Sequence, residues 1–378
     1  MKILINCIPL LKRLTGVGVY TFELAKELLH LKDKQDVYLF YYGYLSRKLF
    51  CMSDRKGSDV IQITKKVIKN IPCGRRVIKK ILNFFKLRDV DLYFEPNFIP
   101  DIKLKTKATV TTVHDFSFTK REWTPKDRYE FFNQNFISHI YQSSVIITPS
   151  EYIKKELLNT IAFSEDRVVA IHHGIDHNVF NTNHANNNEK GIVVETIKKY
   201  GHYILYVGAI QPRKNIKGLI KAYSILPQSF QKELPLFIVG YEGWNNKVVD
   251  EMIKKNKNIL ILDSVSNNNE LAELYKNASV FVFPSFYEGF GFPPLEAMAC
   301  GCPVVVSNTS SLPEVCGDAA YYVDPHNTES IAKGIISVVE DTDLRKNMIQ
   351  KGLERVKLFT WKKSAHKHQE VFKKALES

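Results

Sequence analysis

The sequence lacks the features of membrane-spanning and disulfide-rich proteins. The 378 residues contain no apolar run of about 18 residues, so no transmembrane helix is expected. The six cysteines are scattered and none forms a CxxC pair. This spacing argues against a disulfide scaffold or a zinc site and favours a reducing cytoplasm. The apolar start has no small-residue cleavage site, and we interpret it as a β-strand rather than a signal peptide.

Acidic residues are absent from one segment. Residues 60–88 contain nine Lys or Arg and no Asp or Glu, and they carry most of the net charge of +13. From Arg75 onward the cations are interleaved with apolar residues, as in amphipathic helices that lie on anionic membranes. The same apolar residues could instead pack on the protein and leave a solvated basic face. A nucleic-acid-binding stripe is a further interpretation, but no nucleic-acid motif accompanies it, so we expect no nucleic-acid partner.

The chain is longer than one hydrophobic core usually spans, about 250–300 residues. Apolar runs of strand length alternate with segments of helical periodicity in both halves, which is typical of parallel sheets with helices on both faces. We therefore predict an α/β protein with two Rossmann-like doubly wound domains that face each other across a cleft. Ligands should bind at the carboxyl ends of the strands. The predicted strands are 2–9, 37–42, 91–94, 109–113, 145–148, 203–207, 236–239, 259–262, 280–283, 304–307 and 321–323.

One asparagine-rich stretch divides the alternating pattern. Residues 181–190 contain five Asn and no apolar residue larger than Ala, so we predict a linker there. The N-terminal domain then spans residues 1–180 and the C-terminal domain residues 191–357. A last helical segment, residues 358–378, follows.

The most informative segment is residues 283–301. A buried strand leads into a loop with Gly289 and Gly291, and Pro293 and Pro294 suit the first turn of a following helix. Glycines let backbone N–H groups approach a ligand, and a helix N-terminus favours a phosphate. The segment therefore indicates an anion-binding site.

Two carboxylates belong to this segment. Glu288 lies in the loop, and we expect Glu296 in the first turn of the helix, which Gly301 should end. One carboxylate could accept hydrogen bonds from sugar hydroxyls and the other from a ribose, as carboxylates do in dinucleotide sites. Taken without its context, such a pair is more often two solvated glutamates.

The segment resembles the E-x7-E signature of retaining glycosyltransferases with the GT-B fold, the group 1 or family 4 enzymes. Further stretches match that family in the same order, so the resemblance covers nearly the whole chain. These stretches are His173-Gly174-Ile175-Asp176, Val207-Gly208 to Lys214-Asn215, Leu312-Pro313-Glu314-Val315, Gly317-Asp318-Ala319-Ala320 and Phe359-Thr360-Trp361. The last of them marks where the final helix of the family crosses back to the first domain.

The resemblance assigns roles to the C-terminal domain, which would bind a nucleoside-diphosphate sugar. It implies that Glu288 lies near the donor sugar and that Glu296 binds the ribose. The backbone amides around Phe290, Gly291 and Phe292 would contact sugar hydroxyls and phosphate.

Arg213 and Lys214 resemble the cationic pair that holds the diphosphate, with Gly208 in the phosphate-binding loop. Fixed cations stabilise the charge that develops on the departing nucleoside diphosphate. Many family members carry an Arg where this chain has Ala209. The Arg213-Lys214 pattern is typical of a mannosyltransferase-like subgroup and favours GDP-mannose, with glucose or another sugar from a UDP-sugar as the alternative. No convincing DxD metal motif is present, so we expect no metal requirement.

The N-terminal domain would face the acceptor. His114 follows a predicted strand, and the histidine at this place in the family contacts the donor sugar or supports the reaction centre. Gly16 and Gly18 resemble the glycine loop that approaches the donor phosphate and the acceptor. Ser150 is interpreted as a helix N-cap rather than a catalytic residue.

The expected reaction is hexosyl transfer with retention of configuration and without a side-chain nucleophile. The expected acceptor is a lipid-linked glycan in O-antigen or other surface polysaccharide synthesis. The enzyme would be cytoplasmic and could lie on the inner face of the plasma membrane through residues 60–88. The alternatives are an epimerase or a non-catalytic GT-B protein, and the intact Glu288 and Arg213 argue against an inactive one.

Overall fold

The structure is a computed structural model of the chain. It describes residues 1–11, 14–31, 36–41, 44–50, 90–101, 106–183, 192–240, 247–262, 265 and 267–377. The basic segment 60–88 and residues 184–190 of the predicted linker lie outside the described residues. Within the described ranges, no helix has both the length and the apolar character needed to cross a membrane.

The first of two compact units comprises residues 1–116, 130–174 and 361–378. Its sheet has seven strands in the order β3-β2-β1-β4-β5-β6-β7, and only the β2–β3 pair is antiparallel. The strands are β1 (Lys2–Asn6), β2 (Asp36–Tyr41), β3 (Tyr44–Ser46), β4 (Leu92–Glu95), β5 (Ala108–Thr112), β6 (Val145–Thr148) and β7 (Val168–Ala170). The helices are α1 (Gly16–His30), α4 (Lys126–Ile140), α5 (Glu151–Thr160) and α15 (Trp361–Glu377), and the 3-10 helix η1 is Ile8–Leu11.

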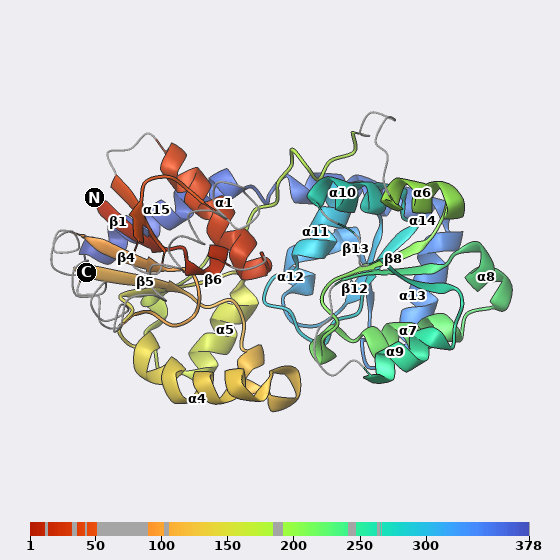
Figure 1. The fold of residues 1–378 in the computed structure, drawn as a ribbon, viewed down its shortest axis with the longest axis horizontal. Coiled ribbons are helices and arrows are strands. Elements are labelled where there is room, and N and C mark those ends of the chain that lie inside the picture. Colours follow the sequence, from red (N-terminus) through yellow and green to blue (C-terminus); the bar gives the residue numbers. More distant parts are fainter. Residues whose placement is uncertain are drawn as a thin grey trace, which may run out of the picture. The chain divides into compact units, whose positions relative to one another are not determined.

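The two ends of the chain meet in this unit. Helix α15 packs beside α1, so the last helix, blue in Figure 1, lies next to the first one, red. Its buried side holds Phe372, whose ring lies 5.1 Å from that of Phe94 on β4. The four residues of β4 are all buried, as expected for a central parallel strand that is covered on both faces.

The second unit comprises residues 117–129 and 175–360. Its six strands are all parallel, in the order β10-β9-β8-β11-β12-β13. The strands are β8 (Ile204–Val207), β9 (Leu236–Val239), β10 (Ile259–Leu262), β11 (Val280–Phe283), β12 (Val304–Ser307) and β13 (Ala320–Val323). The strand order reverses between β8 and β11, and such a switch point is where doubly wound sheets bind ligands.

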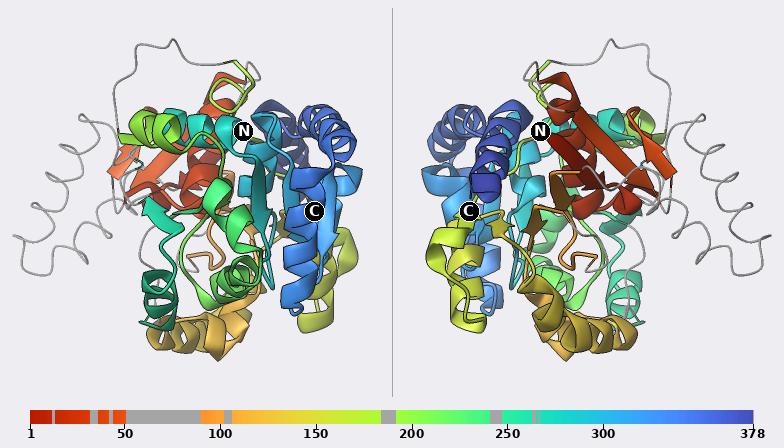
Figure 2. Two further views of the ribbon diagram at one scale, coloured as in Figure 1. Left: turned by 90° about the vertical axis from the view of Figure 1, so that its right-hand side faces the viewer. Right: turned by 90° about the vertical axis from the view of Figure 1, so that its left-hand side faces the viewer.

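Helices cover both faces of this second sheet. Helices α7 (Ile216–Ser224), α9 (Lys247–Lys254) and α13 (Thr328–Glu340) pack together on one face, and α6 (Ile192–Tyr200), α10 (Asn268–Asn277), α11 (Phe292–Ala299) and α14 (Thr342–Val356) form the other set (Figures 1 and 2). The short helices of this unit are α8 (Gln228–Glu233) and α12 (Leu312–Cys316), and its 3-10 helices are η2 (Ser117–Thr119), η3 (Arg121–Trp123), η5 (Pro212–Lys214) and η6 (Gly317–Ala319). The remaining 3-10 helix, η4 (Glu165–Arg167), belongs to the first unit.

The predicted fold class, two doubly wound α/β domains, is confirmed. The predicted N-terminal strand was too long, because β1 ends at Asn6 and the chain turns into η1. The resemblance implies a glycine loop at Gly16 and Gly18, but the structure places both residues in a helix. Gly16 and Gly18 lie in the first turn of α1, where the Val19 N–H donates to the Thr15 carbonyl oxygen. A side chain at Gly18 would meet the Leu14 side chain at 2.9 Å, so this glycine lets Leu14, just before the helix, pack closely against its first turn.

Candidate functional site

The loop after β8 carries the two predicted cations. It begins at Gly208, whose carbonyl oxygen lies so close to Gly240 that a Cβ there would be 2.0 Å from it. The chain then forms η5, which contains Arg213 and Lys214, and it passes into α7 through Asn215. The backbones after β8 and β9 therefore approach each other in a way that only glycine at position 240 permits.

Asn215 fixes this loop to its neighbours. Its backbone is left-handed, with φ of 54°, and its Oδ1 accepts a hydrogen bond from the Gly218 N–H at the start of α7. Its Nδ2 donates to the carbonyl oxygens of Pro284, at 3.0 Å, and Pro325, at 2.7 Å. One buried side chain thus joins the loops that follow β8, β11 and β13.

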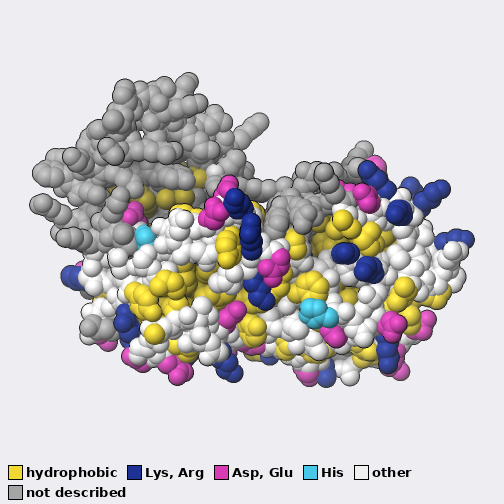
Figure 3. All heavy atoms as spheres, turned by 90° about the horizontal axis from the view of Figure 1, so that it is seen from below, with side chains coloured by type: hydrophobic (Ala, Val, Ile, Leu, Met, Phe, Trp, Pro, Cys, Tyr) yellow, Lys and Arg dark blue, Asp and Glu magenta, His cyan; other side chains and the backbone are white. Residues whose placement is uncertain are grey.

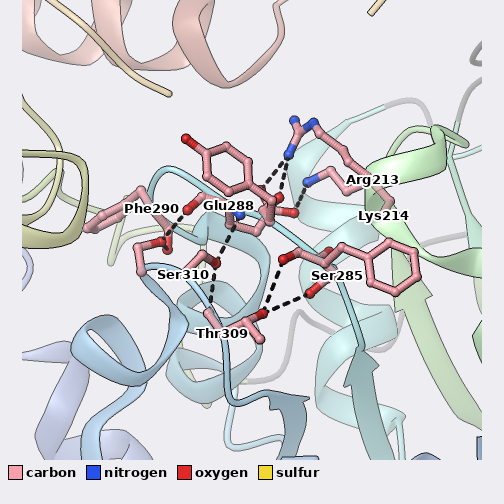
Figure 4. A network of polar contacts seen from close by, with 10 residues as sticks. Arg213, Lys214, Ser285, Glu288, Phe290, Thr309 and Ser310 are labelled. Carbon is pink, nitrogen blue, oxygen red and sulfur yellow. Dashed lines mark hydrogen bonds and ion pairs between the residues drawn. The ribbon is translucent and has the colours of Figure 1, made fainter. Parts of the chain in front are cut away.

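The two cations and the first glutamate form one cluster, which we call the cation–carboxylate cluster (Arg213, Lys214 and Glu288; Figure 4). The Lys214 Nζ lies 2.5 Å from Glu288 Oε1, and an Arg213 guanidinium nitrogen lies 3.0 Å from Glu288 Oε2. The same nitrogen donates to the Tyr287 carbonyl oxygen at 3.0 Å. The structure therefore brings together three residues that the sequence places 74 and 75 positions apart.

The Glu288 carboxyl group is ionised in this setting. Burial alone would raise its pKa, but the charges of Lys214 and Arg213 outweigh burial and lower the pKa below its usual value. Two cations share one carboxylate, so the three side chains together retain one positive charge. Such a cluster at a topological switch point is suited to binding a polyanion.

Three consecutive hydroxyl residues hold the loop that carries Glu288, and we call them the hydroxyl triplet (Thr309, Ser310 and Ser311). Thr309 and Ser310 are labelled in Figure 4. Ser310 Oγ accepts from the Glu288 N–H at 3.0 Å. Ser311 Oγ lies 2.8 Å from both the Glu288 and the Phe290 carbonyl oxygen, which share its one hydroxyl hydrogen. Thr309 Oγ1 donates to the Phe286 carbonyl oxygen at 3.2 Å.

The sequence analysis missed the hydroxyl triplet. Its signal is a run of hydroxyl residues just after the apolar strand β12, at the carboxyl edge of the sheet. Such a run is also typical of a solvated turn, so only the contacts reveal its role.

The end of the Glu288 loop depends on Gly291. This residue has φ of 124°, and a Cβ would lie 2.9 Å from the Leu312 side chain. Helix α11 then begins at Phe292, with Pro293 and Pro294 in its first turn as predicted, and Gly301 adopts φ of 75° just after its end.

The position of Glu296 differs from the prediction. It lies in the second turn of α11, because the helix begins at Phe292 and places Glu296 fifth. Its Oε2 accepts a hydrogen bond from the Tyr275 hydroxyl at 3.1 Å. Burial raises the Glu296 pKa to about 7, although the Tyr275 hydrogen bond lowers it. The carboxyl group therefore titrates near neutral pH.

In the first unit, His114 follows β5. Its Nε2 lies 2.7 Å from the Pro96 carbonyl oxygen, and a carbonyl only accepts, so Nε2 carries the hydrogen and Nδ1 is the acceptor of the neutral ring. Burial lowers the His114 pKa to about 4 and keeps the ring neutral. The ring packs edge-on against Tyr20, at 4.9 Å.

A second buried acid lies near by in the same sheet. Glu95, at the end of β4, accepts hydrogen bonds from Asn6 Nδ2 at 2.7 Å, the Tyr93 hydroxyl at 2.6 Å and the Asn97 N–H at 3.0 Å. Burial raises its pKa to about 8.

Ser150 caps α5 through the Ile153 N–H, as predicted. Among the described residues, no three His, Cys, Asp or Glu side chains are grouped so that they could hold a metal ion.

Comparisons with known proteins give consistent results. Residues 187–355 match the family model of "Glycosyl transferases group 1", and residues 14–179 match that of "Glycosyltransferase Family 4". The O-antigen chain mannosyltransferase B of Escherichia coli is 32% identical over 377 residues, which cover 96% of this chain and 96% of that protein.

Solved structures share the fold at low sequence identity. Sucrose-phosphate synthase from Thermosynechococcus elongatus has a TM-score of 0.71 at 16% identity, covering 99% of this chain and 98% of the other. The Anabaena protein HepE in complex with UDP-glucose has a TM-score of 0.71 at 15% identity, covering 99% of this chain and 100% of the other.

Proposed function

Because this chain belongs to the group 1 and family 4 glycosyltransferases, we propose that it transfers a mannosyl residue from a nucleoside-diphosphate donor to a glycan acceptor during O-antigen synthesis. The E. coli relative, which matches nearly the full length of both chains, is an O-antigen chain mannosyltransferase. We take GDP-mannose as the donor, on the basis of the Arg213-Lys214 pattern, and a UDP-sugar as the alternative.

The observation that carries this proposal is the cation–carboxylate cluster at the switch point of the second sheet. A diphosphate placed there would meet Arg213 and Lys214, which would stabilise the charge that develops as the nucleoside diphosphate departs. These fixed cations could replace a divalent metal, so we propose a metal-independent reaction.

Glu288 would then act on the sugar. Its ionised carboxylate can accept hydrogen bonds from hexose hydroxyls while it still holds the two cations in place. The amides of Phe290, Gly291 and Phe292, at the start of α11, would contact sugar hydroxyls and phosphate. Gly208 would allow the diphosphate to approach the backbone.

Glu296 would bind the ribose hydroxyls through its carboxylate. In the first unit, neutral His114 would contact the donor sugar through Nδ1. Gly16 and Gly18 lie in the first turn of α1, and we propose that the free backbone N–H groups of this turn bind a phosphate or the acceptor. We propose retention of configuration, with the leaving phosphate helping to deprotonate the acceptor hydroxyl and no side chain acting as the nucleophile.

We further propose a lipid-linked glycan acceptor and a cytoplasmic enzyme on the inner face of the plasma membrane. The argument is the basic amphipathic sequence of residues 60–88, together with the absence of any nucleic-acid motif. Helix α4 of the first unit also exposes two large apolar side chains, Phe131 and Ile137. Figure 3 shows hydrophobic side chains gathered on the surface of the first unit in the view from below. Such side chains would suit an interfacial acceptor.

The purified protein tests this function when it is given GDP-mannose, with and without an extracted lipid-linked glycan. We expect GDP release only when the acceptor is present, together with a mannosylated product. Release of UDP from UDP-glucose, with no release of GDP from GDP-mannose, would show that the donor is a UDP-sugar. Interconversion of donor isomers without any transfer would indicate an epimerase and overturn the proposal.

A further inference from the structure

A buried tyrosine holds the second glutamate of the signature. The Tyr275 hydroxyl on α10 donates to Glu296 Oε2 on α11 at 3.1 Å. Among the described residues, Tyr275 is the one hydrogen-bond partner of this carboxyl group. The tyrosine side chain is fully buried, whereas Glu296 is half-buried, so the hydrogen bond reaches the carboxylate from its inner side.

The tyrosine ring has little freedom to move. It packs edge-on against Phe281 of β11, with 5.4 Å between ring centroids, and against Phe180, at 6.1 Å. Burial and the nearby Glu296 charge raise the Tyr275 pKa well above its usual value, so the hydroxyl keeps its proton and always donates. The carboxylate therefore meets a fixed donor on one oxygen.

We propose that Tyr275 is a positioning residue for nucleotide recognition: it fixes the Glu296 carboxylate so that its remaining lone pairs accept the ribose hydroxyls of the donor. This inference rests on the proposed function, in which Glu296 binds the ribose. A carboxylate has about four acceptor positions, and the tyrosine occupies one of them on the protein side. The side chain then loses little rotational freedom when the ribose binds, because the hydrogen bond has already restricted it.

A purely structural role for the same hydrogen bond is the competing explanation, since it also links α10 to α11. The two explanations differ in one measurable respect. A structural link affects every nucleotide equally, whereas a positioning residue matters only for a ligand that carries the hydroxyl groups that Glu296 accepts.

The test measures the affinity of the whole protein for GDP, 2′-deoxy-GDP and 3′-deoxy-GDP by calorimetry at pH 8.5, where Glu296 is ionised. The variants are Tyr275→Phe, Glu296→Gln and a matched control, Tyr203→Phe. Tyr203 is also fully buried, and its hydroxyl donates to the Leu274 carbonyl oxygen at 2.7 Å. Thermal unfolding of each variant shows whether it is folded.

We expect Tyr275→Phe to weaken GDP binding about tenfold, and to weaken binding of at least one deoxy analogue less than about twofold. Glu296→Gln should likewise weaken GDP binding more than binding of a deoxy analogue, and its loss of GDP affinity should be larger. Tyr203→Phe should bind GDP as the wild type does. An equal loss for all three nucleotides in Tyr275→Phe, or no loss, would overturn the positioning role.

The same experiment separates this inference from the proposed function. If Glu296→Gln distinguishes GDP from the deoxy analogues and Tyr275→Phe does not, only the inference fails. If Glu296→Gln changes the affinity for all three nucleotides equally, the assignment of Glu296 to the ribose fails, and the positioning role of Tyr275 fails with it. If the wild type does not bind GDP, the guanine assignment fails, and UDP with its deoxy analogues gives the same comparison.

Discussion

The side-chain amide of Asn215 donates a hydrogen bond to the Pro284 carbonyl oxygen, 69 residues further along the chain, at 3.0 Å. Pro284 directly follows β11, and Asn215 directly follows the two cations. This contact fixes the distance between the loop that carries Arg213 and Lys214 and the loop that carries Glu288. The cation–carboxylate cluster therefore depends on a neutral residue that does not belong to it.

Asn215→Ala should destabilise the protein by about 2–3 kcal/mol, because it removes an N-cap and leaves two buried carbonyl oxygens without their donor. Urea unfolding measures this loss. Asn215→Asp keeps the N-cap acceptor but turns a carboxylate toward the Pro284 and Pro325 carbonyl oxygens. This variant should therefore be destabilised at least as much as Asn215→Ala. Wild-type stability in the Asp variant would mean that only the N-cap matters.

Substitutions in the cation–carboxylate cluster should separate sugar recognition from diphosphate binding. Glu288→Gln should lower mannosyl transfer at least about 100-fold while GDP binds as tightly as before or more tightly, since the two cations lose their carboxylate. Arg213→Ala and Lys214→Ala should each weaken GDP binding about tenfold or more and abolish transfer.

Lys221→Ala is the matched control for those variants, because it removes an exposed cation from the neighbouring helix α7. It should leave both GDP binding and transfer unchanged. Near-normal turnover in Glu288→Gln, Arg213→Ala and Lys214→Ala would refute the site assignment.

Nucleotide binding should depend on pH through Glu296. Burial raises the pKa of this group from 4.5 to about 7 in the folded protein, so it is largely protonated at pH 6 and ionised at pH 8. The ionised form accepts ribose hydroxyls better, and affinity for GDP should therefore rise as the pH rises through 7. Calorimetry between pH 6 and pH 8.5 measures this change. In Glu296→Gln the dependence on pH near 7 should disappear, and an unchanged profile in that variant would assign the titration to another group.

The wild-type protein should bind anionic liposomes and dissociate at high salt, because each basic residue near the surface contributes about 1 kcal/mol. Replacing Arg75, Arg76, Lys79 and Lys80 by Gln should reduce binding at least tenfold in a liposome sedimentation assay. Transfer to a soluble acceptor should not change. Equal binding of the wild type to neutral liposomes would contradict the electrostatic contact.

Much of the fold could be predicted because parallel strands are short apolar runs with clear ends. The strands of residues 145–148, 280–283 and 304–307 have the predicted bounds. The glycine loop expected at Gly16 and Gly18 is helical instead, because glycine is common in loops and also occurs where a helix packs closely against a neighbouring side chain, and the sequence pattern does not distinguish the two.

The site was predicted only in part for a related reason. The residue types indicate that Arg213 and Lys214 can bind a diphosphate and that Glu288 can accept hydrogen bonds. No sequence pattern shows that both cations form ion pairs with Glu288. Tyr275 has the spacing of an ordinary core aromatic on α10, and its contact with Glu296 depends on how two helices pack.

The hydroxyl triplet has a thermodynamic consequence for donor binding. Ser310 and Ser311 bond to the backbone of the Glu288 loop within the protein itself, so conformational entropy of this loop is lost when the protein folds. Donor binding should then carry only a small entropy penalty from the loop. Replacing both serines by Ala should make calorimetric binding of GDP-mannose more exothermic and entropically less favourable, as expected when a ligand has to order the segment that receives it.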